Sequence, residues 1–228
     1  MAKKKDQTEK NITAVEEALS KSELFIEKNQ KILTIIVGIL VLLVLIFFGI
    51  RKYYIDPKEK EAASVIFKAE QYFAIDSLYL ALDGDGNYPG FLEIISDYPW
   101  TKTGRLANYY AGIIYLKQGD YNEAIKHLKK FRSKDFLVNN IAKAAIGDAY
   151  MELGNHGKAV SYYLKAASSN ANDLTTPGFL MKAAQTYELM GEWKKALNIY
   201  EKIKKEHYES IEARDIDKSI SHAQAMSK

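Results

Sequence analysis

One segment of this 228-residue chain restricts the fold more than any other. Residues 32–50 read ILTIIVGILVLLVLIFFGI, and none of these nineteen side chains carries a charge. A helix rises about 1.5 Å per residue, so the segment reaches about 28 Å as a helix. That length is close to the ~30 Å hydrocarbon core of a bilayer. The sequence therefore predicts a transmembrane helix at 32–50, which separates a short N-terminal tail from a larger polar part.

A signal peptide and a buried core helix are the two alternatives to a membrane span. A signal peptide has a shorter apolar region close to the N-terminus, followed by a small-residue cleavage site. Here a 31-residue tail comes first, and the end of the segment, GIRK at 49–52, has no such cleavage site. A buried amphipathic helix would show a polar stripe, but Thr34 is the one polar side chain in the segment. The flanks carry residues that suit a membrane–water interface: Lys28, Lys31, Arg51, Lys52, Tyr53 and Tyr54.

The tail, residues 1–31, begins with a lysine-rich stretch and continues into a predicted short amphipathic helix at 13–28. Thr13 and Glu16 have the spacing of a capping box at its start. The tail holds seven lysines, and the first twenty residues after the span hold five Lys or Arg. Charge in a short tail has more influence on orientation than charge in a long domain. We therefore expect a cytoplasmic tail and an exported domain, although the two local counts are nearly balanced.

The composition of residues 51–228 argues against several functions. They carry 25 Lys and Arg against 23 Asp and Glu, a balance that does not favour nucleic acid as a partner. The chain has no cysteine, which excludes disulfides and cysteine-based zinc sites. The four histidines lack metal-ligand spacing, and no phosphate-binding or nucleophile motif occurs. We expect no catalytic residues, no metal and no cofactor, and hence a protein that is not an enzyme.

The stretch DGDGN at 83–87 alternates acidic and amide side chains like the first half of a calcium-binding loop. Such a loop needs glycine at its sixth position and a bidentate glutamate at its twelfth. Tyr88 and Ile94 occupy those positions. The stretch is therefore predicted to be a glycine-rich turn.

Residues 104–206 contain three copies of one pattern. The copies align on a tyrosine, with a small residue three positions before it, a glycine four after it, an alanine five beyond the glycine and a large residue four further on. Glycine at the turn and small residues at the helix crossing suit two closely packed antiparallel helices. In chain order the aligned sets are Gly112, Tyr115, Gly119, Ala124 and Leu128; Gly147, Tyr150, Gly154, Ala159 and Tyr163; and Ala184, Tyr187, Gly191, Ala196 and Tyr200.

A single helix pair cannot bury its apolar face, so repeated pairs stack into a solenoid. The predicted fold class is all-α, with one N-terminal transmembrane helix followed by an α-solenoid. The predicted parts are the tail at 1–31, the span at 32–50, a linker with a degenerate first helical pair at 51–103, three repeats at 104–208 and a C-terminal capping helix at 209–228.

The repeats resemble the tetratricopeptide repeat, whose signature has these residue types at these offsets. The initial tryptophan of that signature is absent, because Asn108 and Lys143 stand in two of its places, and Phe136 replaces the closing proline after the first repeat. The resemblance implies a protein-binding α-solenoid of tetratricopeptide type.

The whole arrangement resembles a narrower group, the YfgM-like ancillary subunits of the bacterial Sec translocon. That group has a charged cytoplasmic tail, one N-terminal span and an exported tetratricopeptide domain. The resemblance implies a single-pass protein of the bacterial inner membrane, with its N-terminus in the cytoplasm and its solenoid in the periplasm. It also implies a role beside exported polypeptides.

The concave face of a solenoid is lined by the first helix of each pair. Helical spacing assigns an apolar end and a polar end to this groove, and several of these side chains have a purely structural alternative, packing against residues 58–98. The predicted partner-binding residues are Leu106, Tyr109, Ile113, Leu116, Ile141, Asp148, Met151, Lys182, Gln185 and Glu188.

Two functions fit these observations. The first is a membrane-anchored protein–protein interaction module of the bacterial envelope, which binds translocon subunits or exported polypeptides near the export machinery. The second is a structural scaffold subunit of a secretion, motility or outer-membrane assembly complex, in which the groove is idle. Both predict protein partners and contact of residues 32–50 with membrane lipid, and neither predicts a nucleic acid or a small-molecule substrate.

Overall fold

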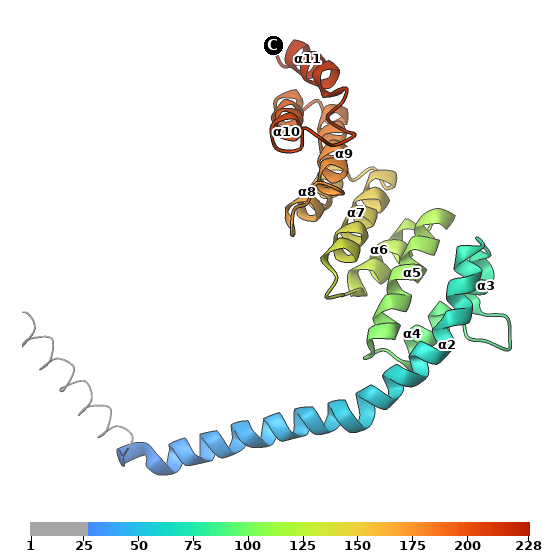
Figure 1. The fold of residues 1–228 in the computed structure, drawn as a ribbon, viewed down its shortest axis with the longest axis vertical. Helices are drawn as coiled ribbons and strands as arrows, with labels where there is room; N and C mark the ends of the chain where they lie inside the picture. Colours follow the sequence, from blue (N-terminus) through green and yellow to red (C-terminus); the bar gives the residue numbers. More distant parts are fainter. Residues whose placement is uncertain (1–26) are drawn as a thin grey trace, which may run out of the picture. The chain divides into compact units, whose positions relative to one another are not determined.

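The computed structural model describes residues 27–228 and divides the chain into two compact units, Met1–Ile55 and Asp56–Lys228. The predicted amphipathic helix of the tail lies almost wholly outside the described residues. Between 27 and 228 the chain forms helices joined by turns and contains no strand, as the all-α prediction requires (Figure 1).

The apolar segment is helical throughout and belongs to one helix that runs over Glu27–Ala74. Apart from Leu33, which is partly buried, the large apolar side chains of 32–50 are between 47% and 64% exposed, and no residue of the most apolar window is buried. Thr34 donates its hydroxyl to the Gln30 carbonyl oxygen at 2.8 Å, so its polar group is satisfied within the helix. This helix is long and apolar enough to cross a membrane. Its apolar surface is not explained by burial in a protein core, because its most apolar window is not buried.

The predicted linker after the span is instead helical. A π-helical turn, η1 (Arg51–Ile55), leads without a break into α2 (Asp56–Ala74). Pro57 does not interrupt the helix, although the sequence favours a boundary at this position. The side chains of η1 are exposed or nearly so, and Tyr53 is 79% exposed.

Residues 56–98 form three helices and not the expected degenerate pair. Besides α2 they are α3 (Leu78–Asp83) and α4 (Phe91–Asp97). α2 ends at Ala74, and Asp76, two residues later, takes a positive φ of 59°. The glycine-rich stretch is a turn, as predicted, and the Asp85 carboxylate accepts the hydroxyl of Tyr72 at 2.6 Å and two backbone amides of the turn.

The three repeats form the six helices α5–α10, which follow one another along the chain (Figure 1). Each pair is joined by the same backbone turn, in which an amide donates to the carbonyl of the aligned tyrosine at 2.8–2.9 Å. The glycine of each turn has a positive φ, from 69° to 84°. The helices are α5 (Lys102–Gln118), α6 (Tyr121–Lys130), α7 (Phe136–Glu152), α8 (His156–Ser168), α9 (Thr176–Leu189) and α10 (Trp193–Glu206).

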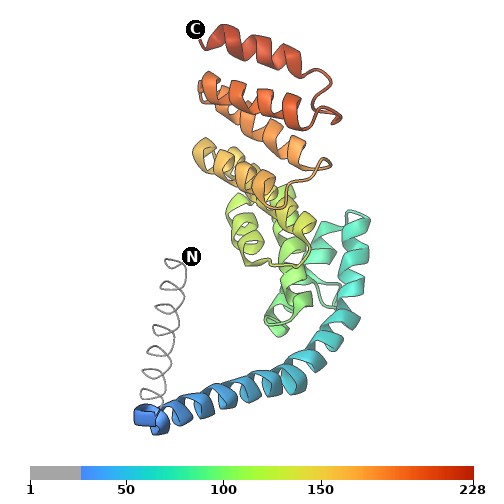
Figure 2. The ribbon, with the colours of Figure 1, turned by 60° about the vertical axis from the view of Figure 1, so that its left-hand side comes forward.

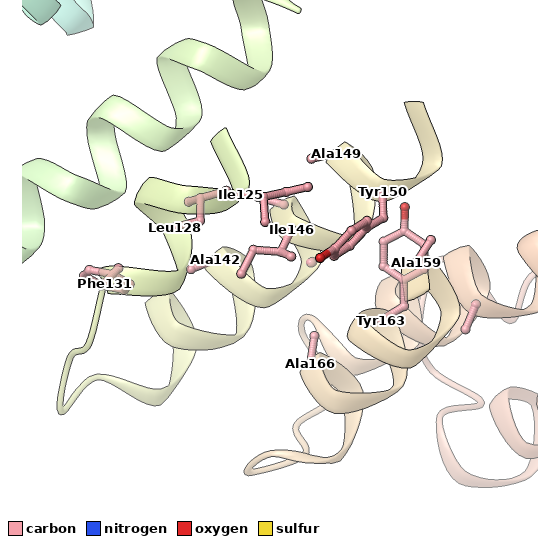
Figure 3. Packing of buried hydrophobic residues seen from close by; sticks show 13 residues of the cluster. Ile125, Leu128, Phe131, Ala142, Ile146, Ala149, Tyr150, Ala159, Tyr163 and Ala166 are labelled. Atoms are coloured by element: carbon pink, nitrogen blue, oxygen red, sulfur yellow. The ribbon is translucent and has the colours of Figure 1, made fainter. Parts of the chain in front are cut away.

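The small residues allow the close helix contacts that the repeat pattern predicts. A Cβ atom added to Gly112 would lie 2.5 Å from Leu128 Cγ, and one added to Gly147 would lie 2.5 Å from Tyr163 Cε1. Both partners belong to the second helix of the same pair and are almost fully buried. Figure 3 shows the central cluster that joins α6, α7 and α8, with Tyr163 at the contact between α7 and α8.

The C-terminal helix α11 (Ile216–Met226) begins later than predicted. Residues 208–215 form successive turns, so the predicted boundary at 209 is wrong for the helix itself. Ile216 and Ala223 are buried in a cluster with Ile203 of α10, and α11 lies beside α10 in Figure 2. The helix therefore closes the last repeat, which is the role expected of a capping helix.

A buried histidine in the first repeat makes stability dependent on pH. His127 lies against the Tyr115 ring, and its Nδ1 is 3.0 Å from Asn108 Oδ1. The Asn108 amide nitrogen donates to Gly104 O, so Oδ1 accepts and Nδ1 donates. Burial, with a smaller contribution from Lys130, lowers the pKa of His127 below its usual value.

We call the compact unit Asp56–Lys228 the repeat unit. Its free energy of unfolding is expected to decrease as the pH falls below about 6.5, the ordinary histidine pKa. Below this pH, His127 binds a proton more readily in the unfolded chain than in the folded protein, where its pKa is lowered. Protonation therefore favours the unfolded state. Urea unfolding at neutral pH and at about pH 5.5 measures the loss. H127Q should reduce the difference between the two midpoints, and equal differences in both proteins would refute this role of His127.

Candidate partner-binding face

The apolar end of the predicted groove serves mainly as core. Tyr109, Ile113 and Leu116 are partly buried against the central cluster. Leu106 packs against this cluster and also against a second cluster, which is formed by buried residues of α2, α3, α4 and α5. Burial raises the pKa of Tyr109. These four side chains of α5 thus hold neighbouring helices together. The structural alternative raised by the sequence was packing against residues 58–98, and of the four only Leu106 also packs against the cluster that includes those residues.

The polar end of the predicted groove is occupied by an internal network. The Asp148 carboxylate on α7 accepts Lys182 Nζ on α9 at 2.7 and 2.9 Å. The same carboxylate accepts the hydroxyl of Tyr163 at 2.7 Å. Burial and this hydrogen bond raise the pKa of Tyr163. The network links consecutive repeats, so Asp148 and Lys182 are positioned by each other before any partner arrives.

The remaining predicted residues differ in their exposure. Met151 is partly buried, and its sulfur lies 3.5 Å from the hydroxyl oxygen of Thr186, which donates to the Lys182 carbonyl oxygen at 2.7 Å. Ile141 and Glu188 are half-buried, whereas Gln185 is exposed. The surface accessible to a partner therefore consists of Gln185, the outer parts of Ile141 and Glu188, and the Asp148–Lys182 ion pair. The predicted residues do not form one continuous exposed groove.

A cavity of about 720 Å³ lies beside the first turns of α5, and we name it the loop cavity. Its apolar lining comes from Leu106, Phe131 and Val138. Leu106 is the one predicted groove residue that lines it. The cavity lies where residues 131–135 connect the first repeat to the second without a helix.

Charged side chains surround the loop cavity. They come from α2, from the start of α5 and from the connection that follows α6, and cations outnumber carboxylates among them. Glu59 on α2 caps α5, because its carboxylate accepts the amide of Lys102 and the hydroxyl of Thr103. The charged lining residues are Glu59, Lys102, Arg105, Arg132, Lys134 and Asp135.

Sequence reasoning missed the loop cavity because it relied on the repeat pattern. The available signal was the connection FRSKD at 131–135, which separates the first two repeats and matches no position of the aligned pattern. An apolar cavity with a charged edge can bind an apolar side chain of a peptide while the edge contacts its backbone or its charges. The described residues contain no group of three or more His, Cys, Asp or Glu that could hold a metal ion.

Comparison with known protein families identifies the repeats. Residues 106–135 and 179–210 match one family model and residues 142–173 match another, and both are described as the tetratricopeptide repeat. The matched segments coincide with the pairs α5–α6, α7–α8 and α9–α10. No curated protein matches the chain. The chain thus contains three tetratricopeptide repeats, which indicate a protein–protein interaction module.

Proposed function

We propose that this protein is a membrane-anchored interaction module of a bacterial envelope, which binds polypeptides beside the protein-export machinery. Its tail lies in the cytoplasm and its repeats in the periplasm. The apolar helix carries the proposal, because its exposed side chains require a nonpolar surrounding. The resemblance to the YfgM-like subunits supports the choice of the export machinery.

Tethering suits a site of modest affinity. A helix that holds the repeats at the membrane raises their effective concentration near any partner in the same bilayer. The loop cavity has room for an apolar anchor side chain, and the outer parts of Ile141, Gln185 and Glu188 can add contacts along the peptide. Most binding energy in such complexes comes from a few anchors, so the loop cavity is the first site to test.

A photoactivatable residue at Arg105, on the edge of the loop cavity, is expected to crosslink to newly made exported polypeptides in membranes. The same residue at Lys194, an exposed position on α10, is the matched control. The adducts at position 105 should exceed those at position 194, and they should disappear when export is blocked. Mass spectrometry of the adducts identifies the partners.

The scaffold hypothesis makes a different prediction for the same experiment. A structural subunit would crosslink to fixed components of one complex, in the same amount with or without export. Adducts that persist unchanged when export stops would contradict the proposed binding of exported chains. Equal adducts at positions 105 and 194 would contradict the loop cavity as the site.

A further inference from the structure

A second cavity lies at the junction of the first two repeats and has a strongly cationic lining. Its volume is about 560 Å³, and α6, α7 and α8 all contribute to it. We name it the cationic pocket after its four charged residues, Lys129, Arg132, Lys143 and Lys165. No acidic residue lines it.

The four cations lack carboxylate partners. Among the described residues, no Asp or Glu oxygen lies within 4 Å of their charged nitrogens, in contrast to Lys117, Lys126 or Lys182 elsewhere in the unit. Lys129 Nζ donates to the Tyr150 hydroxyl at 3.1 Å, and Lys143 Nζ donates to Asn140 Oδ1 at 3.1 Å. These acceptors are neutral, so the positive charge is left uncompensated.

Of the four cations, Lys143 gives the clearest indication that the pocket binds an anion. Counting seven residues back from the aligned tyrosine gives Asn108 in the first repeat, Lys143 in the second and Leu180 in the third. Asn108 and Leu180 are buried. Burial lowers the pKa of Lys143, the direction expected for a cation that has lost water without gaining an anion. An anionic ligand would supply the missing counter-charge.

The floor and the sides of the cationic pocket are apolar and aromatic. Leu128, Ala142 and Ile146, which Figure 3 shows in the central cluster, line its base. Tyr162 lies at the side, with Lys165 Nζ 5.0 Å from its ring centre. A ligand that fills the pocket must therefore present apolar groups together with negative charge.

The pocket uses the face of α7 opposite to the predicted groove. Asn139, Lys143 and Ile146 follow one another at three- and four-residue intervals, which places them on one side of the helix. Ile141 and Asp148 lie about half a turn away, at 100° per residue. Occupation of the cationic pocket would thus leave the Asp148–Lys182 side free.

We infer that the cationic pocket binds an acidic segment of a partner polypeptide, with carboxylates at the lysines and apolar side chains on the floor. Polypeptide fits better than free phosphate or a lipid headgroup, because the volume and the apolar floor exceed what one such anion can fill. The cationic pocket shares Phe131 and Arg132 with the loop cavity, but Lys129 and Lys165 line the cationic pocket and not the loop cavity. Variants at these two lysines therefore test the inference separately from the proposed function, and either can fail without the other.

Fluorescence anisotropy on the full-length protein in a nonionic detergent tests this inference. The probe is a short peptide of alternating Glu and Leu with a neutral fluorophore, and the control peptide has Gln in place of Glu. The acidic peptide is expected to bind and the Gln peptide is not. Added salt should weaken binding, since the contact depends on exposed charges.

The double variant Lys129→Gln, Lys165→Gln is expected to weaken peptide binding about tenfold, because two charge-assisted contacts are lost. The glutamine amide introduced at position 129 can still donate to the Tyr150 hydroxyl. The matched control removes two charges from α10, where Lys194 and Lys205 are exposed, and should bind like the wild type. Circular dichroism melting of both variants checks the fold, and the single variant Lys165→Glu replaces the double one if that protein melts early.

Three results would overturn the inference. The first is no binding of the acidic peptide to the wild type, and the second is equal binding to the pocket variant and the control variant. The third is equally effective displacement of the peptide by inorganic phosphate or by glycerophosphoglycerol, the headgroup of phosphatidylglycerol. This last result would identify a site for phosphate-type anions and not for an acidic polypeptide.

Discussion

Replacement of Gly147 by valine is expected to lower the free energy of unfolding of the repeat unit by about 3 kcal/mol, the upper end of the usual cost of overpacking. The added Cβ would lie 2.5 Å from the Tyr163 ring. That ring is almost completely buried, and its hydroxyl is held by Asp148. The ring must therefore move, and its hydrogen bond to Asp148 must distort or break.

The midpoint of urea unfolding measures this effect, and Gly157→Val is the matched control. Gly157 lies in the first turn of α8, where an added Cβ meets no atom within 4 Å. The control should change stability by less than about 0.5 kcal/mol. Equal midpoints for the two variants would show that the close approach of α7 and α8 does not depend on glycine.

Two arginines in the middle of the apolar helix, Leu40→Arg and Val44→Arg, are expected to abolish stable membrane insertion. Both native side chains are more than half exposed. Arginine near the centre of a span costs about 3 kcal/mol, so the pair costs about 6 kcal/mol. The measurement is the fraction of full-length protein that stays in the membrane pellet after carbonate extraction.

The matched control is Leu40→Ala with Val44→Ala, which shortens the same side chains without adding charge. This variant should remain in the pellet with the wild type. If the arginine variant also remains there in full, residues 32–50 are not the anchor, and the membrane-tethered function loses its basis.

The repeats were predictable from sequence because the same residue types recur at positions where backbone conformation or close packing requires them. Three glycines at the turns adopt positive φ, and three alanines after them are fully buried. A positive φ favours glycine and a fully buried helix contact favours alanine, and three aligned copies make coincidence improbable. The length of the apolar segment likewise needed no tertiary information.

The N-terminal part of the repeat unit could not be predicted in the same way. A break after Ala74 depends on how Phe73 and Tyr72 pack against later residues, and nothing repeats there to reveal it. Pro57 signals a boundary, yet the helix continues through it. Proline inside a helix lacks one backbone donor and crowds the preceding turn, and that preceding turn is the π-helical η1.

The groove assignment was limited by a different ambiguity. Helical spacing tells which residues share a face, but not whether a neighbouring element covers that face. Tyr109 and Leu116 share the face of Leu106 and are covered. The two cavities instead share Phe131 and Arg132 of the connection between the first two repeats. Their charged lining comes from positions that the aligned pattern does not specify.

The same backbone turn joins the two helices of each pair, and this has an evolutionary consequence. Every copy ends its first helix with the same backbone bond to the aligned tyrosine. α11 covers the last pair with Ile216, Ile220 and Ala223, helped by the contact of His222 with Trp193 and the ion pair of Asp217 with Lys204. Duplication or loss of one unit would therefore change the reach of the protein without redesigning its interior. Gene-level growth and shrinkage of this molecule can proceed in steps of about thirty-five residues.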